Sequence, residues 1–150
     1  MTQFEQVFWQ FIVAALLIFI TISIQTVFNI AILYWVLRVF RQLEINFNLF
    51  WRISVIARVI FAFIGVHLVQ ISIWALGYLL LGLFPVYADA LFYSLAVFST
   101  SDTAGITLPD RWRLLGPFEG LSGIIAFGLS IGFMFTVIGR LLESRMQRRR

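Results

Sequence analysis

The sequence predicts an all-α membrane protein with three spanning helices, one short helix and a re-entrant loop. Of its 150 residues, 61% are apolar and only 12% are charged, which excludes an ordinary soluble domain of this length. Three apolar segments are long enough to cross a bilayer, which takes about 20 residues. Between the second and the third lies a shorter apolar segment that ends in a run of hydroxyl side chains.

The first two spanning helices are separated by a polar break. The first is expected from Val7 to about Leu37 and the second from about Val59 to Leu83, closed by Pro85. Aromatic side chains near the helix ends match the belts found at membrane interfaces: Phe8, Trp9, Tyr34, Trp35, Trp74 and Tyr78. The break contains charged and amide side chains and is where the chain is expected to turn round: Arg38, Arg41, Glu44, Asn46, Asn48, Arg52 and Arg58.

The short helix is expected from Ala90 to about Phe98, too few residues to cross a bilayer. Residues 99–105 then supply hydroxyls, one carboxylate and two small residues between two long apolar segments. Non-helical polar backbone at membrane depth is tolerated only where it lines a water-filled path or is buried in protein. Hydroxyl and carbonyl rings build ion filters, so this segment is the candidate site.

The third spanning helix is expected to open at Gly116 and Pro117 and to run to about Leu142. Arginines follow both the first and the third helix, and the positive-inside rule puts both clusters in the cytoplasm. The N-terminus and the loop are then outside. We divide the chain into an N-terminal helix with its cytoplasmic turn, residues 1–45, and a second unit, residues 46–150, with a short basic tail.

The segment ALFYSLAVFSTSDTAGIT, residues 90–107, resembles the pore loop of the potassium channel family, whose pore helix is roughly ALxxS and whose filter is TTVGYGD. Ala90, Leu91 and Ser94 match the helix, and Ser99 and Thr100 match the two threonines. Where the family has GYGD, this chain has DTAG. The segments HLVQISIWALGYLLLG and TLPDRWRLLGPFEGLSG are similar to a bacterial branch with three membrane helices. The resemblance implies a homotetramer around one pore.

A potassium filter lines its path with backbone carbonyls, and its glycines adopt backbone angles that other residues resist. Asp102 tolerates a left-handed conformation, whereas Ala104 adopts one only at a cost. We therefore expect side chains of residues 100–103, rather than stacked carbonyl rings, to face the lumen. The expected filter residues are Ser99, Thr100, Ser101, Asp102, Thr103, Ala104 and Gly105.

In a tetramer, Asp102 would form a ring of carboxylates that holds a cation or is partly protonated. Asp102 is thus the candidate ligand for the permeating cation, and acidic rings select cations. The alternative is that Asp102 caps a backbone turn or pairs with Arg111 or Arg113. These two arginines are candidates for filter support, as is Glu119, which the dipole of the third helix favours near its start.

The motif SGIIAFGL, residues 122–129, resembles the inner helix of simple potassium channels. That resemblance implies a gating hinge at Gly123 and close packing at Gly128. The alternative is small-xxx-small packing, for which Gly128 and Gly132 have the spacing. His67 lies inside the second helix, where an ionisable residue is a functional candidate, but an interhelical hydrogen bond at the third helix is the favoured explanation.

These features predict passive cation conduction by a homotetramer in the bacterial inner (plasma) membrane, with sodium, non-selective or divalent permeation instead of strict potassium selectivity. We expect no enzyme activity, no cofactor apart from permeating cations such as K⁺, Na⁺ or divalent ions, and no nucleic acid. The sequence identifies no soluble partner. The chain offers no activated nucleophile or phosphate loop and no cysteine. Two alternatives stay open: the same pore with another ion class, or a non-conducting helical subunit with a decayed filter.

Overall fold

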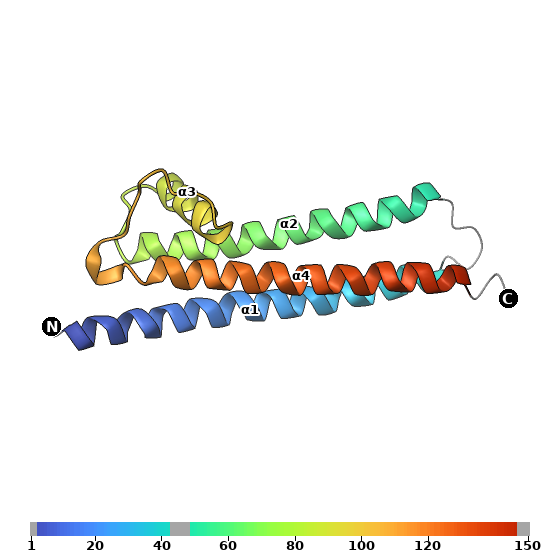
Figure 1. Cartoon of the computed structure of the whole chain (residues 1–150), viewed down its shortest axis with the longest axis horizontal. Helices are drawn as coiled ribbons and strands as arrows, with labels where there is room; N and C mark the ends of the chain where they lie inside the picture. The colour runs from blue at the N-terminus through green and yellow to red at the C-terminus, as the bar shows by residue number, and fades with distance from the viewer. Residues whose placement is uncertain (1–2, 43–48, 147–150) are drawn as a thin grey trace.

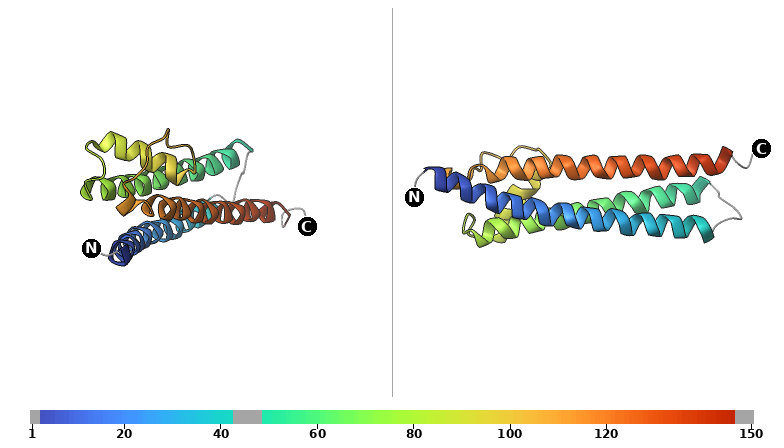
Figure 2. Two further views of the ribbon diagram at one scale, coloured as in Figure 1. Left: turned by 60° about the vertical axis from the view of Figure 1, so that its left-hand side comes forward. Right: turned by 90° about the horizontal axis from the view of Figure 1, so that it is seen from below.

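The computed structural model describes residues 3–42 and 49–146, and these are helical apart from the turns and loops. The elements are α1 (Gln3–Gln42), α2 (Leu49–Leu80), α3 (Tyr87–Phe98), the 3₁₀ turn η1 (Asp110–Trp112) and α4 (Leu115–Met146). The three long helices run side by side along the molecule, with α2 antiparallel to α1 and α4 (Figures 1 and 2). Within the described part, no strand occurs.

Three of the described helices are long and apolar enough to cross a membrane: Phe4–Val39, Ile53–Leu80 and Asp110–Gly139. Their lengths exceed the roughly 20 residues that a bilayer requires. The prediction of an all-α fold with three helices long and apolar enough to span a membrane is therefore confirmed for the described residues.

The polar break between the first two helices is shorter than the sequence predicts. Helix α1 continues through Arg38 and Arg41, and α2 begins at Leu49, so it includes Arg52 and Arg58. Arginine is a good helix former, and its aliphatic stem can lie along an apolar surface while the charge reaches water. Arginines at the membrane boundary therefore extend these helices instead of ending them.

Some sequence predictions lie outside the described residues. Glu44, Asn46 and Asn48 belong to residues 43–48, as does the boundary between residues 45 and 46. The last residues of the basic tail, 147–150, are also outside, although α4 itself runs to Met146.

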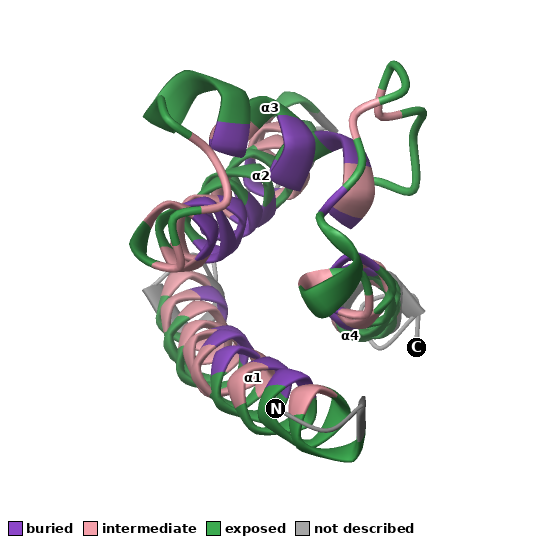
Figure 3. Ribbon diagram, turned by 90° about the vertical axis from the view of Figure 1, so that its left-hand side faces the viewer, coloured by how far each residue is buried: buried purple, intermediate pink, exposed green. Residues whose placement is uncertain are grey.

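Helix α1 contacts both other long helices. Its buried Ala14 and Leu17 join the cluster built around Trp74 and Tyr78 of α2, so the first helix braces the second. Farther along, Val36 joins a second cluster with residues of α2 and α4. Figure 3 shows the buried stripe of α1 turned toward the rest of the bundle.

Trp74 and Tyr78 do not form the interfacial belt that the sequence predicts. Both are 0% exposed and pack in the cluster that joins α2 to α3 and α4. Helix α3 covers this part of α2, so aromatic rings that would face lipid on an isolated helix become core. Phe8, Trp9 and Tyr34 on α1, by contrast, are exposed.

Candidate functional site

The candidate site is the loop that follows α3. After α2, Gly82 takes a φ of +67°, which glycine adopts without strain, and the chain turns back. Helix α3 then runs along α2 toward the middle of the molecule, and residues 99–109 return to the end from which α3 started (Figures 1 and 3). Helix α3 begins at Tyr87 instead of Ala90, which adds almost one turn to the prediction.

The end of α3 lies level with the centres of the spanning helices. The ring of Phe98, its last residue, lies 6.0 Å from the ring of His67 and 5.6 Å from that of Phe127. His67 is near the middle of the span Ile53–Leu80. The hydroxyl-rich loop therefore starts about halfway along the spanning helices.

A buried carboxyl group holds α3 in place. Glu119 on α4 is 0% exposed; Tyr78 OH of α2 donates to its Oε2 (2.5 Å), and Ser94 Oγ of α3 is hydrogen-bonded to its Oε1. Ser94 Oγ also donates to the Ile71 carbonyl oxygen of α2 (2.8 Å). The sequence suggests that Glu119 supports the filter; its partners are on α2 and α3, so any support of the loop is indirect.

The predicted filter residues form an exposed loop closed by local hydrogen bonds. Ser101 N donates to Ala96 O (2.7 Å), which completes the last turn of α3, and Ser99 Oγ lies 3.0 Å from Ser101 Oγ. Thr103 Oγ1 donates to Ile106 O (2.9 Å). Thr103 is half-buried, and the other predicted filter residues are exposed.

Asp102 caps a backbone turn: its Oδ1 accepts from Ala104 N (3.2 Å). This confirms the capping alternative in a single chain. No ion pair joins Asp102 to Arg111 or Arg113, all of which belong to the described residues, so the pairing alternative is wrong here. The two arginines are exposed on and beside η1, which packs against α1.

The positive φ angles of the loop fall on other residues than Asp102, which the sequence favours for a left-handed conformation. Ala104 adopts a positive φ of 53°, as does Thr100 with 56°, whereas Asp102 does not. A left-handed residue costs a non-glycine side chain roughly 1–2 kcal/mol. At Ala104 the cost is offset by the hydrogen bond from its N–H to Asp102, and Gly105 (φ +77°) continues the same turn without strain.

Gly123 is a contact point for the end of α3. A Cβ at this position would collide with the carbonyl oxygen of Phe98. A Cβ at Gly128 would meet nothing within 4 Å, and the same holds for Gly132, so neither packs closely against another described residue of the same chain. Close packing at Gly128 thus has no partner within one chain, and the hinge at Gly123 stays a prediction.

His67 belongs to a buried polar network that links all three long helices. Its Nδ1 lies 3.2 Å from Gln70 Oε1 and its Nε2 lies 3.2 Å from Ser130 Oγ, so the expected bond to the third spanning helix is confirmed. Gln70 Nε2 donates to Gln25 Oε1 on α1 (2.9 Å), and Gln25 Nε2 donates to Ser130 Oγ (3.2 Å). Gln25 and Ser130 are not among the residues that the sequence singles out above, although a polar side chain inside an apolar span is itself a signal.

The loop offers hydroxyl and carboxylate oxygens at the C-terminal end of a helix, where the helix dipole favours a cation. Hard cations prefer oxygen ligands. No group of three or more His, Cys, Asp or Glu side chains that could hold a metal ion occurs within the described ranges of one chain. No family model, no curated protein and no solved structure matches this chain.

Proposed function

We propose that the protein is a homotetrameric cation channel in which the loop after α3 lines the narrow part of the pore. The observation that supports this most directly is the contact between Phe98 and His67, because it sets the start of a polar loop level with the middle of an apolar span. Helix α3 has 12 residues, a length of about 18 Å, and a bilayer core is about 30 Å thick. Such a helix enters the membrane without crossing it.

The exposure of the loop supports assembly around a shared axis. Polar backbone at membrane depth needs water or other protein around it. Within one chain, Thr100, Ser101 and Asp102 are exposed while α3 behind them is anchored through buried Ser94. Copies of the chain that meet at this loop would enclose a wet path and cover the exposed apolar side chains of α4.

The lining chemistry supports cations with weak selectivity. Four copies of Asp102 would bring acidic oxygens together with the hydroxyls of Ser101 and Thr100, and acidic rings select cations. Carbonyl rings of the potassium type need a regular run of backbone oxygens, and here the chain turns at Ala104 and Gly105 instead. Sodium, mixed monovalent or divalent permeation is the expected outcome.

The test is a measurement of reversal potentials on the purified protein in bilayers, with Asp102→Asn beside the wild type. We expect cation flux in the wild type and a several-fold lower cation-to-chloride permeability ratio in Asp102→Asn. Asp110→Asn is the matched control, because Asp110 is an exposed carboxylate in η1, outside the loop. Particle images of the purified protein should show fourfold symmetry.

Two results would overturn the proposal. A reversal potential that follows chloride alone would assign the pore to anions. Leak-level flux in both wild type and Asp102→Asn, together with monomeric particles, would favour the non-conducting subunit.

A further inference from the structure

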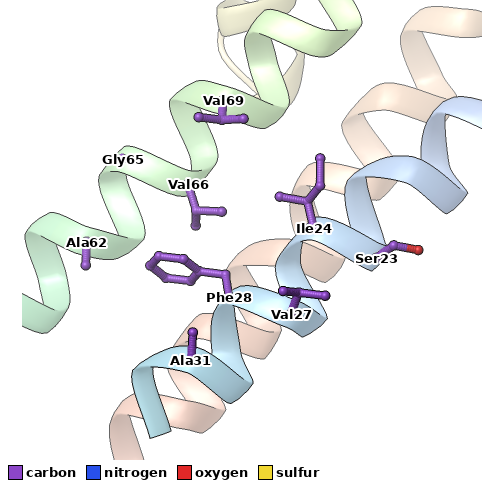
Figure 4. Close-up of a pocket in the computed structure, with 9 residues that line it drawn as sticks. All are labelled: Ser23, Ile24, Val27, Phe28, Ala31, Ala62, Gly65, Val66 and Val69. Carbon is purple, nitrogen blue, oxygen red and sulfur yellow. The ribbon is translucent and has the colours of Figure 1, made fainter. Parts of the chain in front are cut away.

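An apolar groove lies between α1 and α2. Its volume is about 670 Å³, and it is lined by α1 residues between Ser23 and Ala31 and by α2 residues between Ala62 and Val69. Figure 4 shows the two helices with the lining side chains between them. Apart from the Ser23 hydroxyl, every lining side chain is apolar or absent.

Small residues create this groove. A Cβ built at Gly65 would meet nothing within 4 Å. Ala31 on α1 and Ala62 on α2 line one end of the groove with methyl groups only. Phe28 closes the floor, where its ring packs edge-on against Phe63 at 5.5 Å. The small residues therefore leave space between the two helices, and the Phe28 ring bounds that space.

Two arginines continue the groove beyond its alanine end. Arg58 precedes Ala62 by four residues and Gly65 by seven, and Arg38 follows Ala31 by seven residues. Helix positions four or seven residues apart lie on one face. Both arginines are exposed, and no carboxylate of the described residues pairs with either of them.

The spacing matches one leaflet of a bilayer. Arg58 and Val69, at the far end of the groove on α2, are separated by about 16 Å along the helix. Half of a bilayer core is about 15 Å. Arg58 lies inside the span Ile53–Leu80, and an arginine there extends its side chain toward the headgroup region.

We propose that this groove binds one anionic phospholipid. One acyl chain lies between α1 and α2 against Val27 and Val66, and the phosphate lies between the guanidinium groups of Arg38 and Arg58. The two arginines supply charge complementarity that a purely apolar partner, such as another helix, would leave unused, and arginine binds phosphate through paired N–H groups. Lipid binding at this groove does not depend on conduction.

Native mass spectrometry of the detergent-purified protein tests the proposal. The probes are phosphatidylglycerol and phosphatidylcholine with the same acyl chains at the same concentration. We expect the wild type to retain phosphatidylglycerol preferentially. Arg38→Gln/Arg58→Gln should lower that preference by about fivefold for each arginine, and Gly65→Leu should lower retention of both lipids.

Matched controls separate the groove from general effects. Arg111→Gln/Arg113→Gln removes two exposed arginines from the opposite end of the bundle, and Gly132→Leu adds the same side chain at another open glycine, so both should retain lipid as the wild type does. Ala31→Leu is a second groove-filling variant for the case that Gly65→Leu does not fold. Helical circular dichroism reports folding.

Equal retention of the two lipids by the wild type would overturn the proposal. Wild-type retention by both folded groove-filling variants would also overturn it. If these variants lower the oligomer order while lipid retention stays the same, the groove is an interface between copies of the chain.

Discussion

At the scale of single residues, Glu119 shows how a carboxyl group can be buried in an apolar bundle. Its two carboxyl oxygens are hydrogen-bonded to Tyr78 OH and Ser94 Oγ. The Ser94 hydroxyl has only one proton, and Ser94 Oγ also donates to the Ile71 carbonyl oxygen. If Tyr78 donates to Oε2 and Ser94 donates to Ile71, then Oε1 must itself donate to Ser94. A proton on the carboxyl group completes this chain of donors and acceptors, and it also avoids the cost of a buried unpaired charge.

These hydrogen-bond donors and acceptors predict that the fold tolerates Glu119→Gln but not Glu119→Ala. The glutamine amide can donate to Ser94 Oγ while its carbonyl accepts from Tyr78 OH, so the thermal midpoint should stay near that of the wild type. Alanine leaves the buried Tyr78 hydroxyl without its partner, at about 1–3 kcal/mol, whereas Ser94 keeps its bond to the Ile71 carbonyl oxygen. Thermal unfolding in detergent measures the midpoints of the two variants. If glutamine destabilises as much as alanine, the network requires a carboxylate.

The partners of Glu119 could not be predicted from the sequence. The position of Glu119 near the start of an apolar helix marks it as unusual, yet Tyr78 and Ser94 precede it by 41 and 25 residues. Contacts at such separations depend on how the helices pack, which local patterns do not encode. The capping role of Asp102 is different, because its partner is only two positions away and a local pattern therefore suffices to suggest it.

At the scale of elements, the docking of α3 onto α4 depends on Gly123. Gly123→Ala should displace the end of α3, because the added Cβ meets the Phe98 carbonyl, and overpacking of this kind costs about 1–3 kcal/mol. Gly128→Ala is the control, since its Cβ position is open and alanine is the better helix former by roughly 0.5–1 kcal/mol. Thermal midpoints should fall for the first and hold or rise for the second. An unchanged midpoint for Gly123→Ala would show that α3 is not tightly docked.

The helices themselves were predictable because their signals are local. Three long apolar segments indicate the three spans, and the short apolar segment indicates α3 within three residues at its start. The helix ends were less predictable. Charged Arg38 and Arg58 indicate a membrane boundary, but arginine is compatible with helix on either side of that boundary, so charge alone does not end a helix.

At the scale of the whole molecule, buried amides bind the three long helices into one unit. Apolar side chains facing lipid gain little from association, so packing and interhelical hydrogen bonds carry more of the specificity. Gln25 of α1 is hydrogen-bonded to Gln70 of α2 and to Ser130 of α4. His67 of α2 is hydrogen-bonded to the same Gln70 and Ser130, so it also links α2 to α4. A further hydrogen bond at one end, from Leu114 N to Gln10 Oε1 (2.9 Å), ties α1 to the start of α4.

This arrangement predicts that Gln70→Leu loosens α1 from the bundle. The change removes the bonds to Gln25 and to the Thr21 carbonyl oxygen, together with the bond to His67 within α2, at a cost of about 1–2 kcal/mol. Ser72→Ala is the control, because the Ser72 hydroxyl donates to Leu68 O within α2 (2.8 Å) and its loss should leave the thermal midpoint unchanged. Since Gln25 and Gln70 share one bond, the double variant Gln25→Leu/Gln70→Leu should lose less than the sum of the two single variants. Additive losses would mean that the two amides act separately and that the helices are held together by apolar packing.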